Sequence, residues 1–241
     1  MEPKSLSTCS RNPNEGWRIT IYGSAGAGKT TLLGGFPKPM LIFDFDNKLD
    51  PLYGIDGIDF ISYNFDDPKD CSKVWKQFLR DFKEAKVSDK YVTLGFDSLT
   101  YMNKLLLVNV LINSGKATEF RPQIQHFGEM KDSFEFLFME MNKIPDKNVI
   151  LLAHVLDIVD DSEDSPIILE RVPLITGRQI KSELPALFKE VYYLERKGGV
   201  DDKRVLYYKP YKKAIANSLL LSGDGVIESP TFDKLVARRI Q

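Results

Sequence analysis

The sequence contains little cysteine, no long apolar run and almost no net charge, and each absence excludes a class of protein. Two cysteines among 241 residues, Cys9 and Cys71, are too few for a disulfide framework. Together with the lack of a signal peptide, they favour a reducing, cytoplasmic environment. No apolar run approaches the ~20 residues that a membrane helix needs, so we expect no membrane partner. The 33 Lys and Arg residues nearly balance the 34 Asp and Glu residues, so any nucleic-acid surface must be a local patch.

The composition that remains is that of a folded protein. Hydrophobic residues make up 43% of the chain, aromatic residues 11% and charged residues 28%, a balance that excludes a disordered chain. A polar stretch without periodicity covers residues 1–15, and we expect it to be a flexible arm. Residues 16–241 are long enough to form a single domain with its own core.

Short apolar runs alternate with longer helical patterns along the chain. This alternation predicts an α/β fold with a mostly parallel central sheet flanked by helices. The predicted strands are Trp17–Tyr22, Met40–Phe45, Phe60–Tyr63, Tyr91–Phe96, Val149–His154, Val191–Leu194 and Val205–Tyr208. The predicted helices are Lys29–Gly35, Cys71–Ala85, Leu99–Asn113, Phe127–Lys143, Ile180–Lys189 and Thr231–Ile240.

Three segments between these elements stand out by length or charge. Ser114–Gln125 and Leu156–Gly177 are predicted to be long loops, and the second of them begins with several acidic residues. Long loops at the carboxyl ends of strands often carry function. Near the end of the chain, Lys203–Lys213 holds five basic residues and no acidic residue.

The strongest motif is the run Gly23-Ser-Ala-Gly-Ala-Gly28-Lys29-Thr30 between a predicted strand and a predicted helix. Small residues let successive backbone N–H groups curl around a phosphate, and the following helix adds its positive dipole end. We expect Lys29 to contact the β- and γ-phosphates and Thr30 to offer its hydroxyl to Mg²⁺. The motif predicts that ATP and Mg²⁺ bind at Gly23, Ser24, Ala25, Gly26, Ala27, Gly28, Lys29, Thr30 and Thr31.

Asp97 is the best candidate for a second group at the magnesium ion. It ends the apolar strand Tyr91–Phe96 and precedes Ser98. A carboxylate in this position can hold the water shell of Mg²⁺ in a phosphate-loop protein. The alternative is that Asp97 only caps the next helix.

Several of these features together resemble the ATPase core of RecA-type recombinases. They are the phosphate loop, the stretch Leu41-Ile-Phe-Asp-Phe-Asp-Asn-Lys-Leu-Asp-Pro-Leu-Tyr53 and the strand that ends at Asp97-Ser98. The short length and Gly177-Arg178, followed by Leu-Pro-Ala-Leu-Phe, resemble the phage-encoded branch of small single-strand annealing recombinases. The resemblance covers roughly Trp17 to Leu221, and it implies a RecA-like P-loop core in the cytoplasm of a bacterial host.

The resemblance also implies roles for individual residues. Asp46 matches a glutamate that activates the attacking water, although its side chain is one methylene shorter; the alternative is an acid in a strand-end loop. Asp50 and Tyr53 match residues that contact adenine, or else form a proline-containing turn. His154 matches a residue that senses the γ-phosphate and couples it to DNA, or else is a satisfied polar group at a strand end.

The same resemblance implies three kinds of partner: single-stranded DNA, further copies of the chain in a filament or ring, and a single-strand-binding protein. By their order along the chain, the two long loops match the two loops with which the family contacts DNA. Cations in these loops suit DNA phosphates, and an aromatic ring suits stacking on a base. Lys212 and Lys213 resemble lysines that complete the site of a neighbouring subunit, or else lie at a solvated tip. The candidate DNA contacts are Lys116, Phe120, Arg121, Arg171, Arg178 and Lys181.

The sequence therefore predicts a DNA-dependent ATPase that anneals or exchanges single strands. Three alternatives stay open at this point. The first is a small-molecule P-loop kinase, although the arginine-rich lid of such enzymes is not evident. The second is a helicase core of the same fold, and the third is a module in which ATP only gates DNA binding.

Overall fold

Strands and helices alternate along the chain. The computed structural model describes residues 15–115, 121–161, 167–176, 188, 190–198 and 202–240. The strands are β1 (Arg18–Gly23), β2 (Met40–Asp44), β3 (Ile58–Ser62), β4 (Thr93–Asp97), β5 (Asn148–Asp160), β6 (Ile167–Pro173), β7 (Glu190–Lys197), β8 (Lys203–Tyr207) and β9 (Val226–Glu228). The α-helices are α1 (Lys29–Leu33), α2 (Cys71–Val87), α3 (Leu99–Asn113), α4 (Ile124–Asn142) and α6 (Phe232–Ala237), and short 3-10 turns cover η2 (Asp50–Leu52) and η3 (Pro68–Asp70).

The strands form one nine-stranded sheet in the order β3-β2-β4-β5-β1-β7-β8-β9, with β6 paired to β5. All neighbours from β3 to β7 in this order are parallel, whereas β8, β9 and β6 are antiparallel additions. The expected α/β fold with a mostly parallel sheet flanked by helices is therefore confirmed. Because β5 lies between β1 and β4, the carboxyl ends of these three strands meet at one edge of the sheet.

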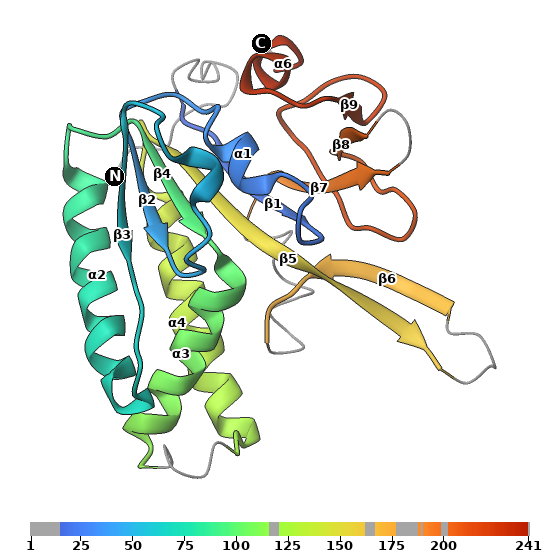
Figure 1. The fold of residues 1–241 in the computed structure, drawn as a ribbon. Coiled ribbons are helices and arrows are strands. Elements are labelled where there is room, and N and C mark those ends of the chain that lie inside the picture. The colour runs from blue at the N-terminus through green and yellow to red at the C-terminus, as the bar shows by residue number, and fades with distance from the viewer. Residues whose placement is uncertain are drawn as a thin grey trace, which may run out of the picture.

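Two apolar layers cover the two faces of the sheet. In β2, Leu41 and Phe43 belong to the layer under α2, α3 and α4, while Met40 and Ile42 belong to the layer under α1 and α6. This alternation follows from the two-residue period of a strand. Figure 1 shows the three long helices on one side of the sheet and the shorter α1 and α6 away from them.

Most element boundaries agree with the sequence patterns to within a few residues. Helix α3 spans the predicted residues Leu99–Asn113, and α2 begins at the predicted Cys71. Helix α4 begins at Ile124, inside the loop expected at Ser114–Gln125. Strand β9 was not predicted, because three residues are too short to show a pattern. The predicted helix Ile180–Lys189 falls almost entirely outside the described residues.

The prediction of a long loop at Leu156–Gly177 was wrong. Strand β5 continues to Asp160 and pairs with β6 in an antiparallel hairpin that projects from the rest of the molecule (Figure 1). Branched apolar residues stand among the acidic ones here, as in Ile158, Val159 and Ile167, and they favour extended backbone. The segment was predicted to be a loop because its acidic residues are typical of loops, although its branched apolar residues favour a strand.

Candidate nucleotide-binding site

The phosphate loop connects β1 to α1 and is shaped by its glycines. Gly26 and Gly28 have φ angles of 76° and 94°, which non-glycine residues rarely adopt. Gly23 and Ser24 turn their carbonyl oxygens to the Lys29 ammonium group, which donates a 2.9 Å hydrogen bond to each. Burial lowers the pKa of Lys29, whereas the nearby charges of Asp97 and Asp46 raise it. The loop therefore holds a buried ammonium group beside its backbone N–H groups.

Thr30 and Asp97 meet across the sheet edge. The Thr30 hydroxyl donates a 2.7 Å hydrogen bond to Oδ2 of Asp97, which is 4% exposed at the end of β4. Burial raises the pKa of Asp97 to about 6, although the hydrogen bond from Thr30 lowers it. Hydroxyl and carboxylate oxygens are hard ligands that suit Mg²⁺. Among the described residues no group of three or more His, Cys, Asp and Glu side chains could hold a metal ion.

Asp46 and His154 form an acid–imidazole pair on the same edge. Nε2 of His154 lies 3.2 Å from Oδ2 of Asp46, and Nζ of Lys48 lies 3.0 Å from Oδ1. Burial raises the pKa of Asp46, but the hydrogen bonds from His154 and Lys48 outweigh it and the net pKa is lowered. Asp46 is therefore a fixed carboxylate at neutral pH.

The turn that presents Asp46 is held by a buried acid. Oδ1 of Asp44, the last residue of β2, accepts hydrogen bonds from the backbone N–H groups of Asp46 (3.1 Å) and Asn47 (2.8 Å). The hydroxyl of Ser62 in β3 donates to the other carboxylate oxygen. His154 is placed by β5, in register with Gly23 of the phosphate loop. Strands β2 and β5, which lie on either side of β4, thus bring residues 46 and 154 together.

These groups line one pocket of about 380 Å³. It includes Asp50, as the sequence predicts, whereas Tyr53 is 70% exposed and lies outside it. Ala27 packs into the core instead of the pocket. Sequence reasoning missed Lys48, Pro51 and Arg204. The pocket is lined by Ala25, Gly26, Gly28, Lys29, Thr30, Thr31, Asp46, Lys48, Asp50, Pro51, Asp97, His154 and Arg204.

The other predicted site residues lie elsewhere or outside the described part of the chain. Arg121 is exposed just before α4. Arg171 in β6 donates to Asp157 at 3.1 Å, so its charge is already paired. The ammonium of Lys212 lies over the Tyr211 ring, and Lys213 borders the hairpin, so neither lines the pocket of its own chain. Four predicted DNA contacts are outside the described residues: Lys116, Phe120, Arg178 and Lys181.

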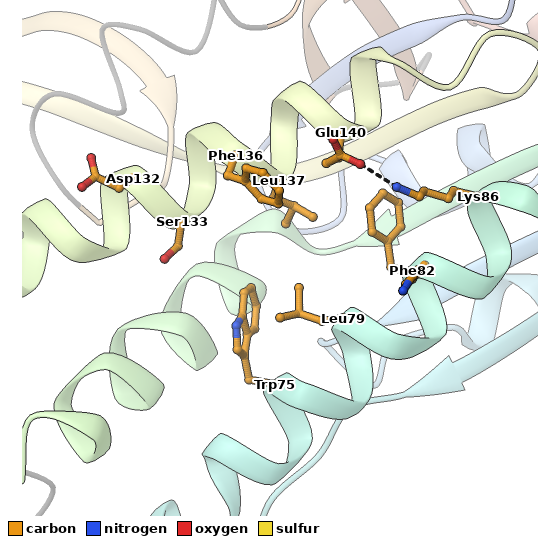
Figure 2. A pocket seen from close by; sticks show the side chains of 10 residues that line it. Trp75, Leu79, Phe82, Lys86, Asp132, Ser133, Phe136, Leu137 and Glu140 are labelled. Carbon is orange, nitrogen blue, oxygen red and sulfur yellow. Dashed lines mark hydrogen bonds and ion pairs between the residues drawn. The ribbon is translucent and has the colours of Figure 1, made fainter.

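A second hollow of about 610 Å³ lies between α2 and α4 and has a different character. Figure 2 shows Trp75, Leu79 and Phe82 facing it, with the Lys86–Glu140 ion pair at one end. Hydrogen bonds from Lys86 and Lys143 hold the pKa of Glu140 at about 2. This hollow is mainly apolar and lies over the helices, away from the sheet edge that carries the phosphate loop. Its polar groups come from α2 and α4, and none of them belongs to the phosphate loop.

The parallel sheet, phosphate loop and Thr30–Asp97 pair define a P-loop nucleotide-binding protein. The family described as "AAA domain" (AAA_24) matches residues 15–218, and the chain belongs to this family. A search of curated proteins found no match.

Solved structures give distant likenesses. The RadB recombinase is 16% identical, with 82% of this chain and 84% of that chain covered and a TM-score of 0.41. A type III secretion system ATPase from pathogenic bacteria is 17% identical over 76% of this chain, with a TM-score of 0.43. The present chain covers 53% of that ATPase. None of the helices in the described part combines the length and apolar character needed to cross a bilayer.

Proposed function

We propose that this protein is a Mg²⁺-dependent, RecA-like ATPase that assembles on single-stranded DNA and promotes annealing or strand exchange, as phage-encoded recombinases do. The observation that carries the proposal is the Asp46–His154 pair, 3.2 Å apart in the pocket that also holds Lys29 and Asp97. A protein that only binds nucleotide has no need of a fixed carboxylate at this place. A group that positions the attacking water does need one.

Most of the polar groups in the pocket then have a task. Backbone N–H groups of the loop and the ammonium of Lys29 hold the phosphates. Thr30 and Asp97 would hold Mg²⁺, which neutralises phosphate charge when bound. Asp46 accepts a hydrogen bond from the attacking water and so orients it. His154 and Lys48 keep the Asp46 carboxylate ionised and in place.

A chain of hydrogen bonds supports coupling of this site to DNA. The backbone N–H of His154 donates to Thr100 Oγ1 at 3.0 Å, and the Thr100 hydroxyl donates to the Leu174 carbonyl at 2.9 Å. The Leu174 N–H in turn donates to the His154 carbonyl at 2.7 Å. Leu174 directly follows β6, so the base of the projecting hairpin is tied to the residue that contacts Asp46. If bound single-stranded DNA displaced the hairpin, these hydrogen bonds would therefore move His154 relative to Asp46.

The proposal is tested by phosphate release from ATP with no DNA, with single-stranded DNA and with duplex DNA. We expect hydrolysis to need Mg²⁺ and to rise on addition of single strands, and complementary strands to anneal faster when ATP is present. The Lys29→Ala protein is the control for a contaminating ATPase. Phosphate transfer to a metabolite would instead identify a kinase. Unwinding of duplex DNA would identify a helicase, and binding without turnover would identify an ATP-gated module.

A further inference from the structure

Arg204 is a cation in the pocket to which the proposed mechanism gives no task. It belongs to β8, which pairs antiparallel with β7. Two residues further on, Leu206 packs in the apolar layer under α1 together with Ile21 and Leu194. Because side chains in a strand alternate between faces, Arg204 projects from the same face as Leu206. This is the face on which the phosphate loop continues into α1.

The Arg204 side chain lies directly against the loop of its own subunit. A methyl group built on Gly28 would be 2.6 Å from Nε and 2.8 Å from Cζ of Arg204. Gly28 immediately precedes Lys29, and both line the pocket with Arg204. The guanidinium group therefore lies within the space where the loop would hold a phosphate chain.

The other cations near this edge are already engaged. The ammonium of Lys29 donates to two carbonyl oxygens, and Lys48 pairs with Asp46. Arg196, the cross-strand neighbour of Arg204, donates to Asp202 at 2.6 Å. Within the part of the chain that the structure describes, the Arg204 side chain has no ion pair or hydrogen bond. Its N–H donors are thus available to an anion, and phosphate oxygens match their geometry.

We propose that Arg204 binds the phosphate chain of the nucleotide held by its own subunit. This inference rests on the nucleotide site of the proposed function. It adds to that site a phosphate-binding side chain from the same subunit. Arg204 would contribute to affinity in an isolated subunit, before any assembly or DNA. The role therefore differs from that of lysines supplied by a neighbour.

The test is calorimetric titration of the full chain with ADP and with a non-hydrolysable ATP analogue, in Mg²⁺ and without DNA. Arg204→Ala should weaken binding by about 10- to 100-fold, the range of a charge-assisted hydrogen bond. Arg204→Lys should retain part of the affinity, because it keeps the charge but loses the fork of donors. Arg196→Ala, which removes the neighbouring exposed arginine, is the matched control and should bind within twofold of the parent.

Parental affinity in the Arg204→Ala protein would overturn the proposal. If that variant fails to fold, Arg204→Gln keeps a long polar side chain without the charge and should show the same loss. Mixing with Lys29→Ala protein should restore no binding, and restored binding would show that Arg204 acts in trans. A parent that binds nucleotide but never hydrolyses it refutes the proposed ATPase and leaves the Arg204 assignment standing. A parent that binds no nucleotide refutes both.

Discussion

Lys29 shows how one side chain can serve both the loop and its ligand. The residue is 8% exposed, and its ammonium group donates to two carbonyl oxygens of the loop itself. These contacts hold a positive charge in place before any phosphate arrives. The residue is therefore preorganised for an anion, and its loss should affect binding more than folding.

We predict that Lys29→Ala abolishes nucleotide binding and nucleotide-dependent DNA binding while the protein stays folded. The reason is that the ammonium is the cation built into the phosphate loop. Equilibrium binding of a fluorescent ATP analogue and thermal unfolding measure the two properties. Lys76→Ala on the exposed side of α2 is the control. Nucleotide affinity that survives in the Lys29→Ala protein would argue against the assignment.

At this scale the sequence predicted which residues line the pocket better than it predicted the contacts between them. The loop spacing identified Lys29 and Thr30, and the strand pattern placed Asp97 at a strand end. The contact between Asp46 and His154 joins residues that are 108 positions apart. Only the strand order, which no local pattern encodes, brings them together. Arg204 was missed for the same reason, since a lone cation in a basic segment carries no local signal.

At the scale of elements, β7 anchors the segment that follows β8. Glu190 starts β7, is 1% exposed and accepts hydrogen bonds from Tyr192 (2.6 Å), Ser218, Leu219 (2.7 Å) and Leu220 (3.0 Å). Burial raises its pKa, although the hydrogen bonds from Ser218 and Tyr192 lower it. One carboxyl group therefore satisfies donors from two separate segments.

We predict that Glu190→Ala lowers the free energy of unfolding by about 2–4 kcal/mol, because one buried donor and three part-buried donors lose their acceptor at once. Urea denaturation followed by circular dichroism measures the loss. Glu228→Ala, at the exposed end of β9, is the control and should change stability by less than about 0.5 kcal/mol. Equal stability of the two variants would show that the donors find other partners.

Arg121, which the sequence predicts to contact DNA, is exposed just before α4. We predict that Arg121→Ala weakens single-strand binding and reduces the salt slope of log K by about 0.7, the value for one lost phosphate contact. Fluorescence anisotropy over a salt series measures the slope. Arg80→Ala, which removes a similarly exposed arginine from α2, should leave it unchanged. An unchanged slope in the Arg121→Ala protein would remove this loop from the DNA site.

Elements were predictable where one pattern extends over many residues, as in α2 and α3. The β5–β6 hairpin was not, because Asp157 and Asp160 interrupt the apolar alternation that marks a strand. The consequence for function is direct. With Arg171 paired to Asp157, the hairpin offers fewer free cations to DNA than a loop of the same sequence would.

At the scale of the whole molecule, the sheet order explains which groups gather around the nucleotide-binding pocket. Strand β5 between β1 and β4 gathers the loop, Asp97 and His154 at one edge, and Arg204 adds a cation from β8. Lys212 and Lys213 lie beyond β8 with φ angles of 44° and 66°, outside the pocket of their own chain. From this position the two lysines could contact the nucleotide of a neighbouring subunit.

We predict that the Lys212→Ala, Lys213→Ala double variant binds ATP but barely hydrolyses it, because comparable cations supplied in trans contribute ~10³–10⁵ in rate. Mixing it with the Lys29→Ala protein, which keeps both lysines, should restore hydrolysis at mixed interfaces. Electron microscopy establishes whether mixed assemblies form. If they form and activity does not return, the lysines act within one chain or on DNA.

The central claim is that Asp46, held by His154, directs hydrolysis that single-stranded DNA stimulates. The most direct measurement is phosphate release by the parent and by Asp46→Asn, each with and without single-stranded DNA, at saturating Mg²⁺-ATP. The account predicts a loss of ~10²-fold or more in the DNA-stimulated rate of Asp46→Asn, with ATP binding retained and Asp46→Glu active. Equal DNA-stimulated rates for the parent and Asp46→Asn would contradict it.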